Sequence, residues 1–212
     1  MSNQLRMYPH DCPGVLITFC GLDGCGKSTM IQMLAEYMGK KNVEVLLTKQ
    51  PTQEMRHMDI FRTYMDHEDH SQYDYRALSL MAAADRVQHV HQVILPALRE
   101  GKVVICDRYY YSCLANLRAR GYEQDEWVYE ISESIVKPDF AFFLDLPVPI
   151  AVQRVRSRPE ERDRYIDMPL QYRLYEEYRN IAANNKGILL SSYDTIENTY
   201  RNILSHIRRQ IK

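Results

Sequence analysis

The stretch GLDGCGKST at residues 21–29 combines three glycines, a lysine and two hydroxyl residues. It matches the pattern G-x-x-x-x-G-K-[ST], in which a loop wraps backbone N–H groups around phosphates, the lysine reaches the terminal phosphates and the hydroxyl binds Mg²⁺. An apolar run precedes it and a helical pattern follows, so a plain strand–turn–helix is the weaker alternative. The sequence predicts a nucleotide-phosphate site formed by Gly21, Leu22, Asp23, Gly24, Cys25, Gly26, Lys27, Ser28 and Thr29.

A second cluster of chemically active side chains lies in VVICDRYYYS at residues 103–112. Asp107 ends a mostly apolar run, and a carboxylate at the carboxyl end of a strand commonly holds Mg²⁺, often through water. Arg108 follows at once, and a planar guanidinium suits bidentate phosphate binding. A turn role for Asp107 and a solvent-facing Arg108 remain the alternatives.

A third candidate is the arginine-rich stretch RVRSRPEERDR at residues 154–164. If this stretch is helical, Arg154 and Arg158 share one face through their i,i+4 spacing. A mobile segment of this kind can close over a transferring phosphoryl group and stabilise its charge. The alternative is a solvated helix whose arginines pair with the interleaved acids.

The elements that must position these residues alternate between strand-like and helix-like segments. Short apolar runs occur at residues 15–19, 43–48, 102–106, 140–146 and 187–191, and long helical stretches are expected at 73–100, 168–185 and 195–211. This alternation predicts an α/β fold with a parallel sheet and right-handed crossovers. Ligands of such sheets bind beyond the carboxyl ends of the strands, which is where the glycine-rich loop would lie.

The composition favours one globular domain. The chain has 212 residues, 45% of them hydrophobic, and a formal net charge of −1, which argues against a nucleic-acid or anionic-membrane partner. No apolar run is long enough to span a bilayer, and residues 1–13 lack the apolar core of a signal peptide, so they are expected to form a flexible tail. Five scattered cysteines suit a reducing compartment, so a cytoplasmic location is predicted.

Six segments occur in the order found in thymidylate kinases: GLDGCGKST, TKQPTQ, SLMAAADRVQHV, CDRYYYS, KPDFAFFLDL and RDRYID. The chain therefore resembles this family from about residue 14 to its end. The resemblance implies one P-loop kinase domain over residues 14–212, with a three-layer fold and a five-stranded parallel sheet flanked by helices. It also implies transfer of the γ-phosphoryl group of ATP to dTMP with Mg²⁺, giving dTDP and ADP, and a homodimer.

The resemblance also assigns roles to single residues. Asp23 would contact the acceptor sugar or the metal shell, Arg108 the acceptor phosphate and Arg86 the acceptor base, while Pro51 belongs to the acceptor loop. Ser28 and Asp107 would hold Mg²⁺, the latter partly through water. Further acceptor contacts are expected from Ser112 and Tyr165, and Arg154 is expected to bind ATP.

Some family members carry a catalytic arginine at the position of Gly24, and members without it use arginines of the lid. Here the lid is expected around residues 154–167, with Arg158 and Arg162 as its catalytic arginines and Arg156 close behind. Lys27, Arg108 and Asp23 complete the predicted catalytic set.

The base-reading and sugar-reading positions depart from the family pattern. Ala82 replaces a phenylalanine that stacks on thymine, Asn116 replaces an aromatic residue near the sugar, and Gln50 replaces a glutamate. A kinase for another pyrimidine nucleotide, a nucleoside or a phosphorylated metabolite is the alternative. A further alternative is a protein that binds nucleotides without catalysis.

Overall fold

The structure, a computed structural model, describes residues 4–208. Its centre is a five-stranded parallel sheet with the strand order β2-β3-β1-β4-β5. The three inner strands are almost wholly buried, because their continuous apolar runs pack against helices on both faces. The predicted five-stranded sheet is thus confirmed, with strands β1 Val15–Cys20, β2 Val45–Lys49, β3 Val103–Asp107, β4 Phe140–Asp145 and β5 Ile188–Ser191.

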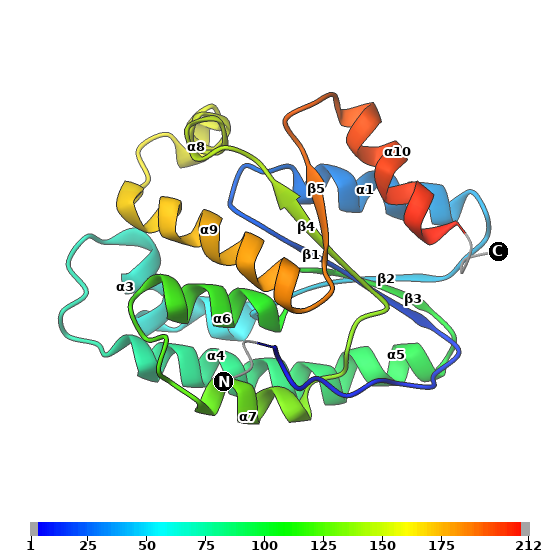
Figure 1. The fold of residues 1–212 in the computed structure, drawn as a ribbon, viewed down its shortest axis with the longest axis horizontal. Coiled ribbons are helices and arrows are strands. Elements are labelled where there is room, and N and C mark those ends of the chain that lie inside the picture. Colours follow the sequence, from blue (N-terminus) through cyan, green and yellow to red (C-terminus); the bar gives the residue numbers. More distant parts are fainter. Residues whose placement is uncertain (1–3, 209–212) are drawn as a thin grey trace.

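Helices cover both faces of this sheet and complete the three layers (Figure 1). One face is covered by α1 Lys27–Gly39 and α10 Ile196–Ile207, which contact each other. The other face carries α4 Tyr75–His89, α5 Leu95–Arg99, α6 Tyr110–Ala119 and α9 Met168–Asn184. The remaining helices are α2 Gln53–His57, α3 Asp59–Asp66, α7 Trp127–Ile131 and α8 Val148–Arg156. No helix among residues 4–208 is long and apolar enough to cross a membrane.

The helix expected over residues 73–100 is present, but a π-helical turn divides it. It runs from Tyr75 to Arg99, and the π turn, Val90–Ile94, joins α4 to α5. Pro96 lies two residues after the end of the π turn, and because proline has no N–H it cannot continue the regular ladder of hydrogen bonds. The helix predicted at 195–211 is α10, whose expected end at residue 211 lies outside the described residues.

The arginine-rich stretch is not one helix, so the condition under which Arg154 and Arg158 would share a face is not met. Helix α8 ends at Arg156, and Arg158 is extended with φ −83° and ψ 126°. Pro159 explains this, because the residue before a proline is disfavoured in the helical region. Arg154 and Arg158 therefore do not share a helix face, and a 3₁₀ turn, η3 Pro159–Glu161, leads into the rest of the segment.

Residues 4–13 pack against the domain, which differs from the flexible tail expected for residues 1–13. Leu5 is buried, and its N–H donates to Asn185 Oδ1 at 2.8 Å. Tyr8 forms a parallel bridge with Val136, just before β4. Residues 1–3 of the expected tail lie outside the described residues.

Candidate active site

The loop between β1 and α1 takes its shape from glycine. Gly21, Gly24 and Gly26 have φ values of 134°, 83° and 97°, in the left-handed region that other residues rarely adopt. A Cβ at Gly24 would lie 2.2 Å from the carbonyl oxygen of Ala151, so α8 packs directly behind the loop. This contact gives a physical reason why residue 24 is a glycine and not an arginine.

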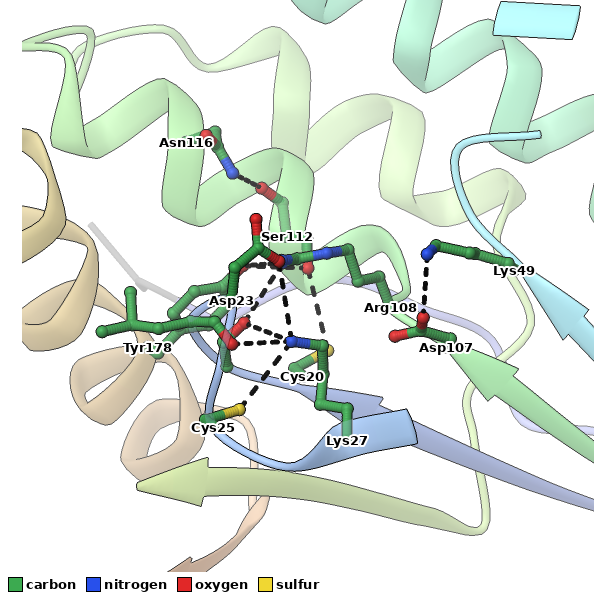
Figure 2. A network of polar contacts seen from close by, with 12 residues as sticks. Cys20, Asp23, Cys25, Lys27, Lys49, Asp107, Arg108, Ser112, Asn116 and Tyr178 are labelled. Atoms are coloured by element: carbon green, nitrogen blue, oxygen red, sulfur yellow. Dashed lines mark hydrogen bonds and ion pairs between the residues drawn. The ribbon is translucent and has the colours of Figure 1, made fainter. Parts of the chain in front are cut away.

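Helix α1 presents an uncapped N-terminus to this loop. No side chain caps it and no acidic residue lies in its first turn, so its free N–H groups and positive dipole end are available to an anion. Ser28 and Thr29, in the same turn, are exposed to the cleft. Lys27 folds over the loop and donates to the carbonyl oxygens of Gly21 at 3.2 Å and Leu22 at 2.7 Å (Figure 2).

Asp23 is the centre of a cluster of cations. Its carboxylate lies 2.5 Å from Arg108 Nη2, 3.2 Å from Arg164 Nη2 and 4.0 Å from Lys27 Nζ. Burial alone would raise the pKa of Asp23, but Arg108, Lys27 and Arg164 together hold this pKa well below its usual value. Asp23 is therefore a carboxylate that keeps three cations close together, of which Figure 2 shows Lys27 and Arg108.

Arg108 is held in an unusual conformation at the start of the segment after β3. Its φ of 66° is rare for a residue with a side chain, and such outliers concentrate at functional sites. Its Nη1 donates to Tyr178 Oη at 2.9 Å, and the Tyr178 hydroxyl donates to Ser112 Oγ at 3.1 Å (Figure 2). Helices α6 and α9 thus fix the guanidinium against the phosphate loop.

A cleft of about 1330 Å³ opens above this cluster, at the carboxyl ends of the strands. It is bounded by the phosphate loop, by the segments after β2 and β3, and by residues 158–167. Most of the predicted site residues line it: Leu22, Asp23, Gly24, Gly26, Lys27, Ser28, Thr29, Pro51, Ala82, Arg86, Asp107, Arg108, Ser112, Asn116, Arg158 and Tyr165.

Five predicted site residues do not line the cleft, among them Arg156, which is exposed and donates to the carbonyl oxygen of Arg162 at 3.1 Å. Gly21 and Cys25 are buried within the loop itself. Arg154 is exposed and donates to the carbonyl oxygen of Ser192 at 3.5 Å, and Arg162 is exposed. In place of Arg162, the structure brings Arg164 into the cleft, where it bonds Asp23 and also pairs with Glu161 at 2.8 Å.

Arg56 is a cleft residue that the sequence analysis missed. Its Nε donates to the Pro51 carbonyl oxygen at 2.9 Å and its Nη2 to that of Gln50 at 3.4 Å. Burial lowers the pKa of Arg56, and the nearby cations Arg108 and Arg86 lower it further. The only feature of the sequence that points to Arg56 is its position just after the segment TKQPTQ.

Arg86 is buried in the wall of the cleft, only 3% exposed. Its Nη1 donates to the carbonyl oxygen of Ala82 at 2.7 Å, while its Nε has no partner among the described residues. Neither Arg86 nor Arg56 forms an ion pair within residues 4–208. Such cations, one buried and one half-buried and neither paired with a carboxylate, indicate a ligand that supplies negatively charged or strongly polar oxygens.

The part of the cleft around Ala82 lacks an aromatic ring at that position but has polar and aromatic groups nearby. Asn116 Nδ2 donates to the Ser112 carbonyl oxygen at 2.9 Å, and its Oδ1 accepts from Arg120 Nη1 at 2.9 Å. The Arg120 guanidinium lies 4.2 Å from the ring centroid of Tyr75. Four tyrosine rings line the cleft in this region: Tyr64, Tyr73, Tyr75 and Tyr122.

The predicted magnesium residues fit a metal that takes most of its ligands from a nucleotide. Asp107 pairs with Lys49 at 3.1 Å, because their strands place them in register, and its buried Oδ1 has no partner among the described residues. The Ser28 hydroxyl is exposed to the same cleft. No group of three or more His, Cys, Asp or Glu side chains within residues 4–208 could hold a metal by itself.

The parallel sheet, the phosphate loop after its first strand and the facing row of arginines together define a P-loop nucleotide kinase. The family model for thymidylate kinase matches residues 19–203. The chain belongs to the thymidylate kinase family.

Curated relatives agree with this assignment. The chain is 37% identical over 203 residues to a probable thymidylate kinase of Pyrococcus horikoshii, with 93% of this chain and 98% of the relative covered. It is 33% identical over 202 residues to a thymidylate kinase of Finegoldia magna, covering 92% and 98%. The thymidylate kinase of Desulfotalea psychrophila is 31% identical over 201 residues, covering 94% and 97%.

Proposed function

We propose that this chain transfers the γ-phosphoryl group of ATP to dTMP, giving dTDP and ADP. One observation carries the proposal: a single cleft holds the phosphate loop with Lys27 on one side and, on the other, the buried cation Arg86 and the half-buried cations Arg56 and Arg108. Such a cleft suits two phosphorylated ligands that face each other. The names of the relatives support dTMP as the acceptor.

The reaction needs positioning and charge stabilisation more than proton transfer. The loop amides and Lys27 bind the donor phosphates, and Arg108 aligns the acceptor phosphate. Arg164 and Arg158 reach the cleft from the lid and stabilise the charge that develops on the transferred group. Because the acceptor is already an anion, an in-line transfer needs no strong general base.

Ser28 and Asp107 would hold Mg²⁺, Asp107 partly through water. Bound there, Mg²⁺ would neutralise charge on the donor phosphates. Lys49 would keep Asp107 in place through their ion pair.

The test is a coupled assay of ADP release over dTMP, dUMP, dCMP, UMP, CMP and unphosphorylated nucleosides. The highest kcat/KM is expected with dTMP. A strong preference for an unphosphorylated acceptor would contradict the proposal, and nucleotide binding without ADP release to any acceptor would indicate a binding protein.

Lys27→Ala provides a second test of the same site. Removing the ammonium group that contacts the donor phosphates is expected to lower kcat by about 10²-fold or more, as for other preorganised charges. The folded state is checked by circular dichroism. Near-normal turnover by this variant would show that the donor site is misassigned.

The quaternary structure and location are also proposals. The family resemblance supports a homodimer, which light scattering of the purified protein would test. All five cysteines are free, which suits the reducing cytoplasm. Imaging of a tagged protein in its own cells would test this location.

A further inference from the structure

His89, the last residue of α4, lies beneath the segment that leaves β2 for the cleft. It is buried, 7% exposed, and does not line the cleft. Its Nδ1 is 3.0 Å from Gln50 Nε2, and its Nε2 is 2.7 Å from Thr48 Oγ1. The imidazole therefore joins the end of β2 to the first residue of the acceptor loop, residues 50–52.

These two contacts select one form of the ring. With the Gln50 amide nitrogen turned toward the ring, His89 Nδ1 accepts from it and the ring proton lies on Nε2, which donates to Thr48 Oγ1; in this arrangement Gln50 Oε1 has no partner among the described residues. Burial lowers the pKa of His89 and favours the neutral ring. Arg86 acts in the same direction, whereas Asp85 and Glu54 oppose it.

The acceptor loop is held from the same helix at a second point. Asp85, one turn before His89, accepts from the Thr52 N–H at 2.9 Å and from the Thr52 hydroxyl. The loop in turn holds Arg56, whose guanidinium donates to the carbonyl oxygens of Gln50 and Pro51. A chain of hydrogen bonds thus runs from His89 through Gln50 to a cation of the cleft.

We propose that His89, as the neutral Nε2–H tautomer, is a positioning residue that acts through Gln50 to place the acceptor loop and Arg56. This inference rests on the proposed function for its kinetic consequence. His89 touches no ligand itself; its role is to fix the side of the cleft that binds the acceptor. The hydrogen bonds of His89 among the described residues go to Thr48 and Gln50, and none goes to the phosphate loop, which forms the donor side.

The kinetic test compares His89→Leu with His89→Asn and with His91→Leu. Leucine removes both hydrogen bonds, whereas asparagine carries an acceptor as many bonds from the backbone as Nδ1 and can still bind Gln50. His91 is exposed on the same helical segment, and within residues 4–208 no hydrogen bond or ion pair joins it to the loop, so it controls for the substitution itself. KM for dTMP, KM for ATP and kcat are measured for each variant.

His89→Leu is expected to raise KM for dTMP about tenfold, because Gln50 loses its buried partner, while KM for ATP stays within about twofold. His89→Asn should recover most of the loss, and His91→Leu should resemble the wild type. Equal changes in both KM values, or an asparagine variant as impaired as leucine, would overturn the inference. So would a loss of thermal stability without any change in KM.

A second measurement needs no turnover and separates this inference from the proposed function. Nitrogen-15 NMR of the imidazole rings should show His89 as the Nε2–H tautomer, and hydrogen exchange of residues 50–56 should accelerate in His89→Leu but not in His91→Leu. The other tautomer, or unchanged exchange, would refute the positioning role even in an active enzyme. If wild type shows no activity but these two results hold, only the proposed reaction fails.

Discussion

Asp23 shows how one side chain organises a group of charges. Without it, Arg108, Arg164 and Lys27 would repel one another in a partly buried loop, because like charges at short range are costly there. Its carboxylate holds all three beside the phosphate loop. Phosphate oxygens could replace these contacts one by one, so the cations are already near the positions that the reaction requires.

Arg164 and Arg162 make a matched pair for the lid. Arg164→Ala is expected to lower kcat/KM by about 10²-fold, because it removes a cation that reaches the cleft and bonds Asp23. Arg162→Ala is expected to stay within about twofold, since the Arg162 side chain is exposed outside the cleft. Steady-state kinetics with dTMP and ATP would check both. A reversed order would restore Arg162 as the catalytic lid residue.

At the scale of elements, α8 and the phosphate loop are in direct contact. The backbone of α8 occupies the space where a side chain at Gly24 would lie, at 2.2 Å from the Ala151 carbonyl oxygen. An arginine at position 24 is therefore excluded, and we expect the additional cations for catalysis to come from the segment after α8. The break of that helix before Pro159 releases this segment, so that Arg158 and Arg164 can reach the cleft.

Gly24→Ala tests this packing. The new Cβ would clash with the backbone of α8, and alanine would have to adopt a φ of 83°. We therefore expect the free energy of unfolding to fall by about 1–3 kcal/mol and ATP to bind more weakly. Gly39→Ala, at the end of α1, has open space around its Cβ and should change stability by less than about 1 kcal/mol. Urea unfolding and nucleotide titration measure both variants. Equal stability of the two would show that the contact with α8 is unimportant.

At the scale of the whole molecule, the cleft and the N-terminal segment lie at opposite edges of the sheet. Loops after β1, β2 and β3 meet at the carboxyl edge because these strands are neighbours in the order β2-β3-β1. The N-terminal segment instead bonds to residues that precede β4, through Tyr8 and Val136. It therefore supports the edge opposite the cleft.

Leu5→Ala is expected to lower the free energy of unfolding by about 2 kcal/mol, because it removes a buried side chain. The kinetic constants should be unchanged, since this segment lies away from the cleft. Asp11→Ala, at an exposed position in the same segment, is the control and should have little effect. Thermal and denaturant unfolding measure the change. Unaltered stability in Leu5→Ala would mean that the segment is not anchored in solution.

The sequence by itself determined the features that depend on neighbouring residues. The phosphate loop, the buried strands and the long helix 73–100 follow from glycine spacing, continuous apolar runs and helical patterning, all local properties. The family order of motifs placed Arg86, Arg108 and Pro51 in one site. The π turn and the break before Pro159 were not predicted, although the proline residues were visible.

Only the tertiary structure decided which distant side chains meet. Arg164 lies 141 residues from Asp23 in the chain, and nothing in the arginine-rich stretch distinguishes it from Arg162. Nothing in the sequence pattern indicates that Arg56 binds the acceptor loop or that His89 contacts Gln50 either. Charges and hydrogen bonds act over a few ångströms in space, so their partners are fixed by how helices and loops pack, which local patterns do not encode.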